Sequence, residues 1–138
     1  MTDSNYRQLD ESIAPLVRAL NSFRGIKTIG SCGGHAAPLQ PGQWEEGSWY
    51  VKFKVLPNEH GWFAVEFLAW LINTDGKSRN WNFYPVAAPP SLNSPGEMLC
   101  FVIEGYDGES PTWFAEHVRE SKELLYVSPY KAGFRRGA

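Results

Sequence analysis

The chain has 138 residues, of which 43% are hydrophobic and 14% aromatic, and this composition excludes a disordered chain and allows one domain with a sizeable core. Thirteen basic and fifteen acidic residues leave a formal charge of -2, so no global field draws the protein to nucleic acid or to a membrane surface. The two cysteines are too few for a disulfide framework. The polar start carries no signal-peptide pattern and no segment is apolar enough to span a membrane, so we expect a cytoplasmic protein.

The first part of the chain reads as a helix, a short strand and a long loop. Apolar residues recur at the spacing of one helical face from about Asn5 to Phe23. Gly25 is a stop signal, and Ile26 to Ile29 form a short strand. Between Ser31 and Ser48 glycine and proline are frequent and no helical period is present, which is typical of a functional or mobile loop.

The remaining elements complete the order αββαββα. Strands are predicted at 49–55, at 80–86 and at 98–104, the last of them apolar on both faces as a central strand should be. The nearly all-apolar segment 61–73 predicts a largely buried helix, with Trp62 and Trp70 in the core. Ser110 and Pro111 open a last helix that reaches about Tyr126, with Phe114 and Val118 inward. A loop at 87–96 and a basic tail at 127–138 are expected outside these elements.

This order predicts a single two-layer α/β domain of the α+β type over residues 1–138. Its sheet should have about four strands, covered by helices. The strands come as two direct pairs, which favours an antiparallel or mixed sheet over a doubly wound parallel one.

The segment TIGSCGGH, residues 28 to 35, concentrates the chemistry-bearing residues. As a nucleophile elbow it would expose Cys32 on a sharp turn, although the residues after it cannot open the required helix. As a metal site it offers only Cys32-x-x-His35, with His60, His117 or Cys100 as distant further ligands, so we assign no metal. As an anion cradle, the N–H groups of Ser31 to Gly34 would converge on a phosphate or carboxylate. The plain alternative is a tight turn with Cys32 packed as a small hydrophobe.

Nearby residues could support an anion site. The strand at 49–55 carries Lys52 and Lys54 on the face opposite its apolar residues, and Lys27 lies in the preceding strand. These lysines would supply the positive charge that the loop lacks. His117 and His60 are more readily explained as boundary residues of their helices.

A longer pattern resembles a known group of proteins. It runs from the helix ending at Asn21, through I-x-T-x-x-S-C-x-G-H, to a strand beginning W-x-V-x-F. This resembles uncharacterised bacterial and phage-borne proteins and, more remotely, the wybutosine-synthesis tRNA methyltransferase family, over residues 9 to 55. The resemblance implies S-adenosylmethionine as a cofactor, methylation of a tRNA base, and functional roles for Ser31, Cys32, Gly34 and Trp49. His35 stands where that family has arginine.

The sequence therefore supports a first hypothesis of a cytoplasmic domain that binds a small anionic or nucleotide-like ligand. In it Cys32 and His35 are candidate catalytic residues, and the candidate ligand-binding residues are Ser31, Gly33, Gly34, Trp49, Lys52 and Lys54. Nucleic acid is a weaker candidate partner. The alternative is a non-enzymatic interaction protein that forms a homodimer or binds a protein partner, and Cys-His hydrolase chemistry is a third hypothesis.

Overall fold

The computed structural model describes residues 11–75, 79–86 and 99–127. In chain order the elements are α2 (Ala14–Asn21), β1 (Ile26–Cys32), β2 (Trp49–Val55), α3 (Glu59–Asp75), β3 (Trp81–Val86), β4 (Leu99–Gly105) and α4 (Pro111–Val127). The strands form one antiparallel sheet in the order β1-β2-β4-β3. The predicted α+β fold with the order αββαββα is confirmed.

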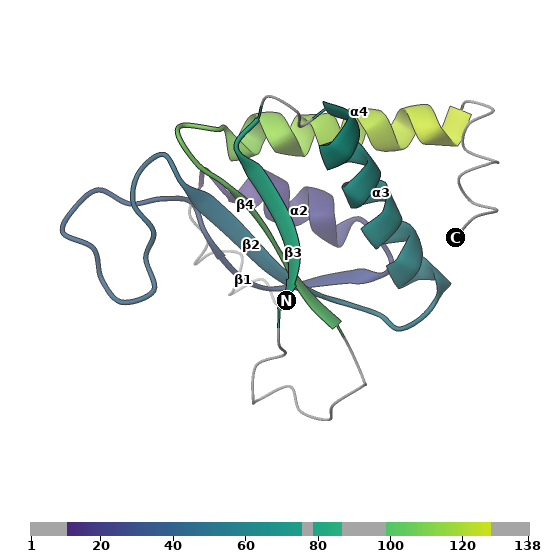
Figure 1. The fold of residues 1–138 in the computed structure, drawn as a ribbon, viewed down its shortest axis with the longest axis horizontal. Helices are drawn as coiled ribbons and strands as arrows, with labels where there is room; N and C mark the ends of the chain where they lie inside the picture. The colour runs from purple at the N-terminus through teal and green to yellow at the C-terminus, as the bar shows by residue number, and fades with distance from the viewer. Residues whose placement is uncertain (1–10, 76–78, 87–98, 128–138) are drawn as a thin grey trace.

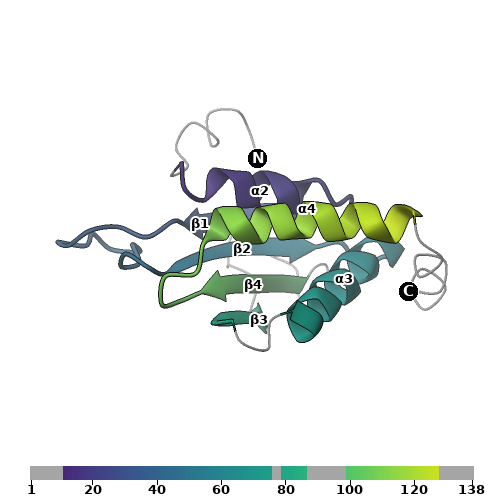
Figure 2. The ribbon, with the colours of Figure 1, turned by 90° about the horizontal axis from the view of Figure 1, so that it is seen from above.

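The helices lie over one face of the sheet, as Figure 1 and Figure 2 show from two directions. Alternation along β2 decides which side chains meet them, because Trp49, Val51, Phe53 and Val55 are buried while the residues between them are half-buried. These side chains pack with the inward residues of the helices into one core that includes Leu16, Val17, Leu20, Phe67, Leu68, Leu71, Phe114 and Val118. We call the opposite side, which none of these helices covers, the open face.

Gly105 makes room for the indole ring of Trp49 on the helix face of the sheet. Trp49 is 1% exposed and lies opposite Gly105 of β4. A Cβ atom on Gly105 would stand 2.5 Å from the Trp49 indole, so only glycine leaves room for that ring. The indole N–H of Trp49 donates to the backbone oxygen of Glu109 at 2.9 Å, which ties β2 to the turn before α4.

Several element boundaries differ from the prediction, most clearly those of α2 and β1. Residues 11–13 form a turn, and α2 begins at Ala14. Pro15 then lies in the first turn of the helix, where proline is tolerated, and not in the interior. β1 continues through Cys32, with an irregular register between Thr28 and Gly30. Residues 5–10, the strand start at Met98, the loop at 87–96 and the tail from 128 lie outside the described residues.

The prediction that Trp62 lies in the core is wrong. Its side chain is 56% exposed, whereas the inward face of α3 is formed by Ala64, Phe67, Leu68 and Leu71. These four positions recur at helical spacing, and Trp62 stands off their line. Trp70 is half-buried and packs against this core, its ring centre 6.0 Å from that of Phe67. In the described part of the chain, no helix is both long and apolar enough to cross a membrane.

Candidate functional site

Cys32 ends β1 in a buried position. Its side chain is 4% exposed, and its sulfur accepts the backbone N–H of Trp44 at 3.3 Å. The Trp44 ring packs against Tyr50, the register partner of Cys32, with ring centres 4.8 Å apart. The thiol is therefore covered by the returning end of the loop, as in the plain interpretation of this segment as a turn.

The loop after Cys32 projects from one end of the sheet (Figure 1). Gly34 has φ +93, and a Cβ there would stand 2.7 Å from the backbone oxygen of Ser48, so the position requires glycine. The next residue, half-buried His35, donates its backbone N–H to the oxygen of Trp44 at 2.7 Å. These contacts close the base of the loop.

The four consecutive N–H groups expected to form an anion cradle do not share one direction. Ser31 and Cys32 belong to the extended strand β1, where they pair with Val51 and Tyr50. Successive N–H groups of a strand point to opposite edges. The N–H groups of Ser31 and Cys32 therefore do not converge on one anion.

The lysines predicted to carry charge are brought together on the open face. Lys27 of β1 stands directly opposite Lys54 of β2, and Lys52 precedes Lys54 by two residues on the same side. Lys27 is exposed, and the other two are half-buried. No carboxylate among the described residues lies within ion-pair distance of them. We call Lys27, Lys52 and Lys54 the lysine cluster.

Gly30 places no side chain on the open face next to this cluster. It pairs with Lys52, and a Cβ added to it would have no atom within 4 Å. Trp49, which the sequence also assigned to the ligand site, lies on the opposite face under α4 and does not reach the cluster. The structure thus joins Gly30 and the lysines, and separates Trp49 from them.

Glu104 is a buried carboxylate on the open face of β4. Its side chain is 4% exposed and accepts hydrogen bonds from Tyr84 Oη at 2.9 Å and Asn82 Nδ2 at 3.3 Å. A further hydrogen bond from the Tyr106 hydroxyl, together with burial and the Glu104 charge, raises the pKa of Tyr106 to about 12. Burial and Glu104 also raise the pKa of Tyr84. Because neutral donors surround Glu104, it does not pair with the lysine cluster.

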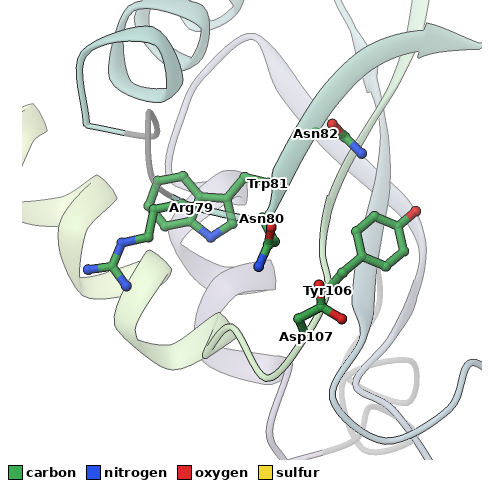
Figure 3. A pocket seen from close by; sticks show the side chains of 6 residues that line it. All are labelled: Arg79, Asn80, Trp81, Asn82, Tyr106 and Asp107. Atoms are coloured by element: carbon green, nitrogen blue, oxygen red, sulfur yellow. The ribbon is translucent and has the colours of Figure 1, made fainter.

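A cavity of about 380 Å³ opens at the start of β3 and is lined by Arg79, Asn80, Trp81, Asn82, Tyr106 and Asp107 (Figure 3). Trp81 is 6% exposed, and its indole N–H has no hydrogen-bond partner among the described residues. The Arg79 guanidinium lies 4.3 Å from the centre of the Trp113 ring and 3.6 Å from Glu109 Oε1. Asp107 adopts φ +52, an uncommon backbone conformation for a residue other than glycine.

Sequence reasoning did not assign a role to Arg79, Trp81, Glu104, Tyr106 or Asp107. The sequence predicted a strand at 80–86 that contains Trp81, but nothing in it showed that the indole N–H lacks an acceptor. The pair Asp107-Gly108 was a visible turn signal. In the described ranges no group of three His, Cys, Asp or Glu side chains is placed to hold a metal ion.

Comparison with known proteins gives no match. No family model, no curated protein and no solved structure matches the chain.

We expect both thiols to react slowly in the folded protein. Cys32 and Cys100 are free and buried, and burial raises the pKa of Cys100, which the charges of Lys52 and Lys54 only partly offset. Iodoacetamide at neutral pH should label them more than about tenfold more slowly than in urea, the factor given by ~1.4 kcal/mol of local opening. A native Cys32 that reacts as fast as the unfolded chain would instead support a nucleophilic role.

Proposed function

We propose that this protein is a cytoplasmic domain that binds a small anionic, nucleotide-like ligand on the open face of its sheet. The lysine cluster holds the phosphate groups, and the surface over Gly30 and beside the Ser31–His35 loop accepts the rest of the ligand. The observation that carries the proposal is the arrangement of Lys27, Lys52 and Lys54 on two neighbouring strands with no carboxylate partner within the described chain.

Like charges directly opposite each other in a sheet destabilise it. A surface with only a structural role gains nothing from placing Lys27 against Lys54. An anion with two or three phosphates relieves this repulsion, because several ammonium groups then share its charge. The half-buried stems of Lys52 and Lys54 fix their positions on the strand and limit the entropy that binding must overcome.

Binding should follow the number of phosphates on the ligand and weaken with salt. We expect calorimetry to give tighter binding in the order AMP, ADP, ATP, and a loss of affinity as ionic strength rises. The same panel includes S-adenosylmethionine, the cofactor that the sequence resemblance implies. This compound contains a nucleoside but no phosphate group.

Two triple variants, one in the lysine cluster and one elsewhere on the surface, each remove three positive charges. Replacing Lys27, Lys52 and Lys54 together by Gln should weaken ATP binding at least about tenfold, or ~1.4 kcal/mol. The control replaces the exposed residues Arg18, Arg24 and Arg119 by Gln, and it should retain binding. The proposal fails if no compound of the panel binds, or if both triple variants lose affinity equally.

A second candidate function, self-association, is favoured by one observation. Trp62 and Leu56 are 56% and 41% exposed around the first turn of α3, and large apolar side chains on a surface often mark interfaces. A stable dimer by light scattering that dissociates on Trp62→Gln would favour this function over ligand binding.

A further inference from the structure

The cavity at the start of β3 is a second site, separate from the lysine cluster. Its lining comes from the start of β3 and from the turn after β4, and Figure 3 shows Arg79 and Trp81 on one side of Asn80, with Asn82 and Tyr106 on the other. A volume of about 380 Å³ falls within the range of ~300–1,000 Å³ typical of small-molecule sites. Lys27, Lys52 and Lys54 do not line it.

The Trp81 indole N–H indicates what kind of atom the cavity would accept. Trp81 packs edge-on against Phe114, with ring centres 4.6 Å apart, and this contact fixes the ring. Its buried N–H has no acceptor within the described part of the chain. Buried donors are nearly always paired, because an unpaired one loses its hydration without compensation. By contrast, the N–H of the buried Trp49 is paired with Glu109. The N–H is covered in this structure, so a ligand oxygen that supplies the missing acceptor must enter with a local shift of the lining.

Arg79 adds a positive charge beside this donor. Its guanidinium stacks on Trp113 and is 5.9 Å from the centre of the Trp81 ring. The ion pair with Glu109, at 3.6 Å, leaves other N–H groups of the guanidinium available, since arginine has five. An indole N–H next to a guanidinium is suited to a carboxylate.

Asp107 adds a negative charge to the same lining. Its carboxylate is presented from a tight turn in which Asp107 has φ +52 and Gly108 φ +83, and the N–H of Glu109 donates to the oxygen of Tyr106 at 3.2 Å. Aspartate and glycine both adopt positive φ readily in turns, so the turn holds the carboxylate at this position without strain. The amides of Asn80 and Asn82 complete a lining with one cation, one anion and neutral donors and acceptors.

We propose that this cavity binds a small zwitterion of the amino-acid class. Trp81 Nε1 and the Arg79 guanidinium hold its carboxylate, and Asp107 holds its ammonium group. This site is independent of the anion site proposed on the open face, and the two proposals fail separately.

The test is a thermal-shift screen of the full chain with the twenty standard amino acids, followed by calorimetry on those that stabilise it. For the amino acid that binds, the acid without its amino group and the amine without its carboxyl group serve as matched probes. Both should bind at least tenfold more weakly. The Lys27, Lys52 and Lys54 triple Gln variant should bind the amino acid as the natural chain does.

Two conservative variants examine the assigned contacts. Trp81→Phe keeps an aromatic ring against Phe114 but removes the N–H, and should lower affinity about tenfold, whereas Trp62→Phe should change nothing. Asp107→Asn keeps a residue that tolerates positive φ and should reduce the preference for the amino acid over the amine-free acid. Because Asp107 is exposed, this variant gives an answer even if Trp81→Phe does not fold. The proposal is overturned if no amino acid binds, if Asp107→Asn keeps the full preference, or if the lysine variant abolishes binding.

Discussion

Gly61→Ala should strongly destabilise the protein, with a loss of about 3 kcal/mol in the free energy of unfolding. Gly61 is buried in the first turn of α3, and an added Cβ would collide with the backbone oxygen of Leu56 and stand 2.7 Å from Val55 Cγ1. Backbone atoms cannot move aside as a side chain can. The N–H of Leu56 also donates to the oxygen of Gly25 at 3.0 Å, so a shift here would separate two turns that pack against each other.

Gly30→Ala is the matched control for this experiment. A Cβ on Gly30 would meet no atom within 4 Å, and alanine restricts the unfolded chain more than glycine does. We expect its free energy of unfolding to stay within about 0.5 kcal/mol of the natural protein in urea titrations. Equal midpoints for the two variants would contradict the close packing of α3 on the turn that ends β2.

Glu104→Ala should have the second large effect, a loss of about 3 kcal/mol. The substitution removes the charged acceptor of Tyr84, Asn82 and Tyr106 together, and hydrogen bonds to a charged group contribute ~1.5–3 kcal/mol. Tyr84 and Asn82 are exposed and can bond to water in the variant, which limits the loss. Removing the exposed carboxylate of Glu120 on α4 should change stability by no more than about 0.5 kcal/mol. Similar losses for the two variants would mean that Glu104 does not organise this part of the open face.

The pH dependence of stability provides a second test of the contact between Glu104 and Tyr106. The pKa of Tyr106 is about 12 in the folded protein and 10.0 in its ordinary state, so between these values the unfolded chain releases a proton that the folded chain keeps. The stabilisation from this hydroxyl is therefore complete below pH 10 and is lost as the pH rises toward about 12. In Glu104→Gln the tyrosine should titrate nearer 10, and stability should depend less on pH over this interval. An unchanged titration of tyrosinate absorbance would contradict the contact.

Much of the fold could be predicted because its signals are local. The alternation in β2 is the period-two pattern of a half-buried strand, the apolar run in β4 is typical of a central strand, and Pro111 marks the start of α4. The turn at residues 11–13 was predicted as helix because the apolar period continues ahead of Pro15 and outweighed the proline. Trp62 was misplaced because α3 is apolar on nearly every side, so its period does not distinguish the inward face.

The site was less predictable because it depends on pairing between strands. The sequence showed that Lys52 and Lys54 share a face, but the register that sets Lys27 against Lys54 is a long-range property. It also could not show that Cys32 is covered by Trp44, since their contact spans the whole loop. The cavity is lined by two segments that are distant in the sequence, so no local pattern predicts it. The sequence also carries no signal that the Trp81 indole N–H is unpaired within the residues that the structure describes.

Ligand binding at the lysine cluster is tested most directly by NMR, by following the backbone amide resonances of the isotope-labelled protein during titration with ATP. We predict that the largest shifts occur at Lys27, Gly30, Lys52 and Lys54, with smaller ones in the Ser31–His35 loop, and that added salt reverses them. The indole signal of Trp49, whose N–H is held by Glu109 on the opposite face, should stay in place. Shifts confined to the helix face or to the cavity around Trp81, with the lysine strands unmoved, would contradict the proposed function.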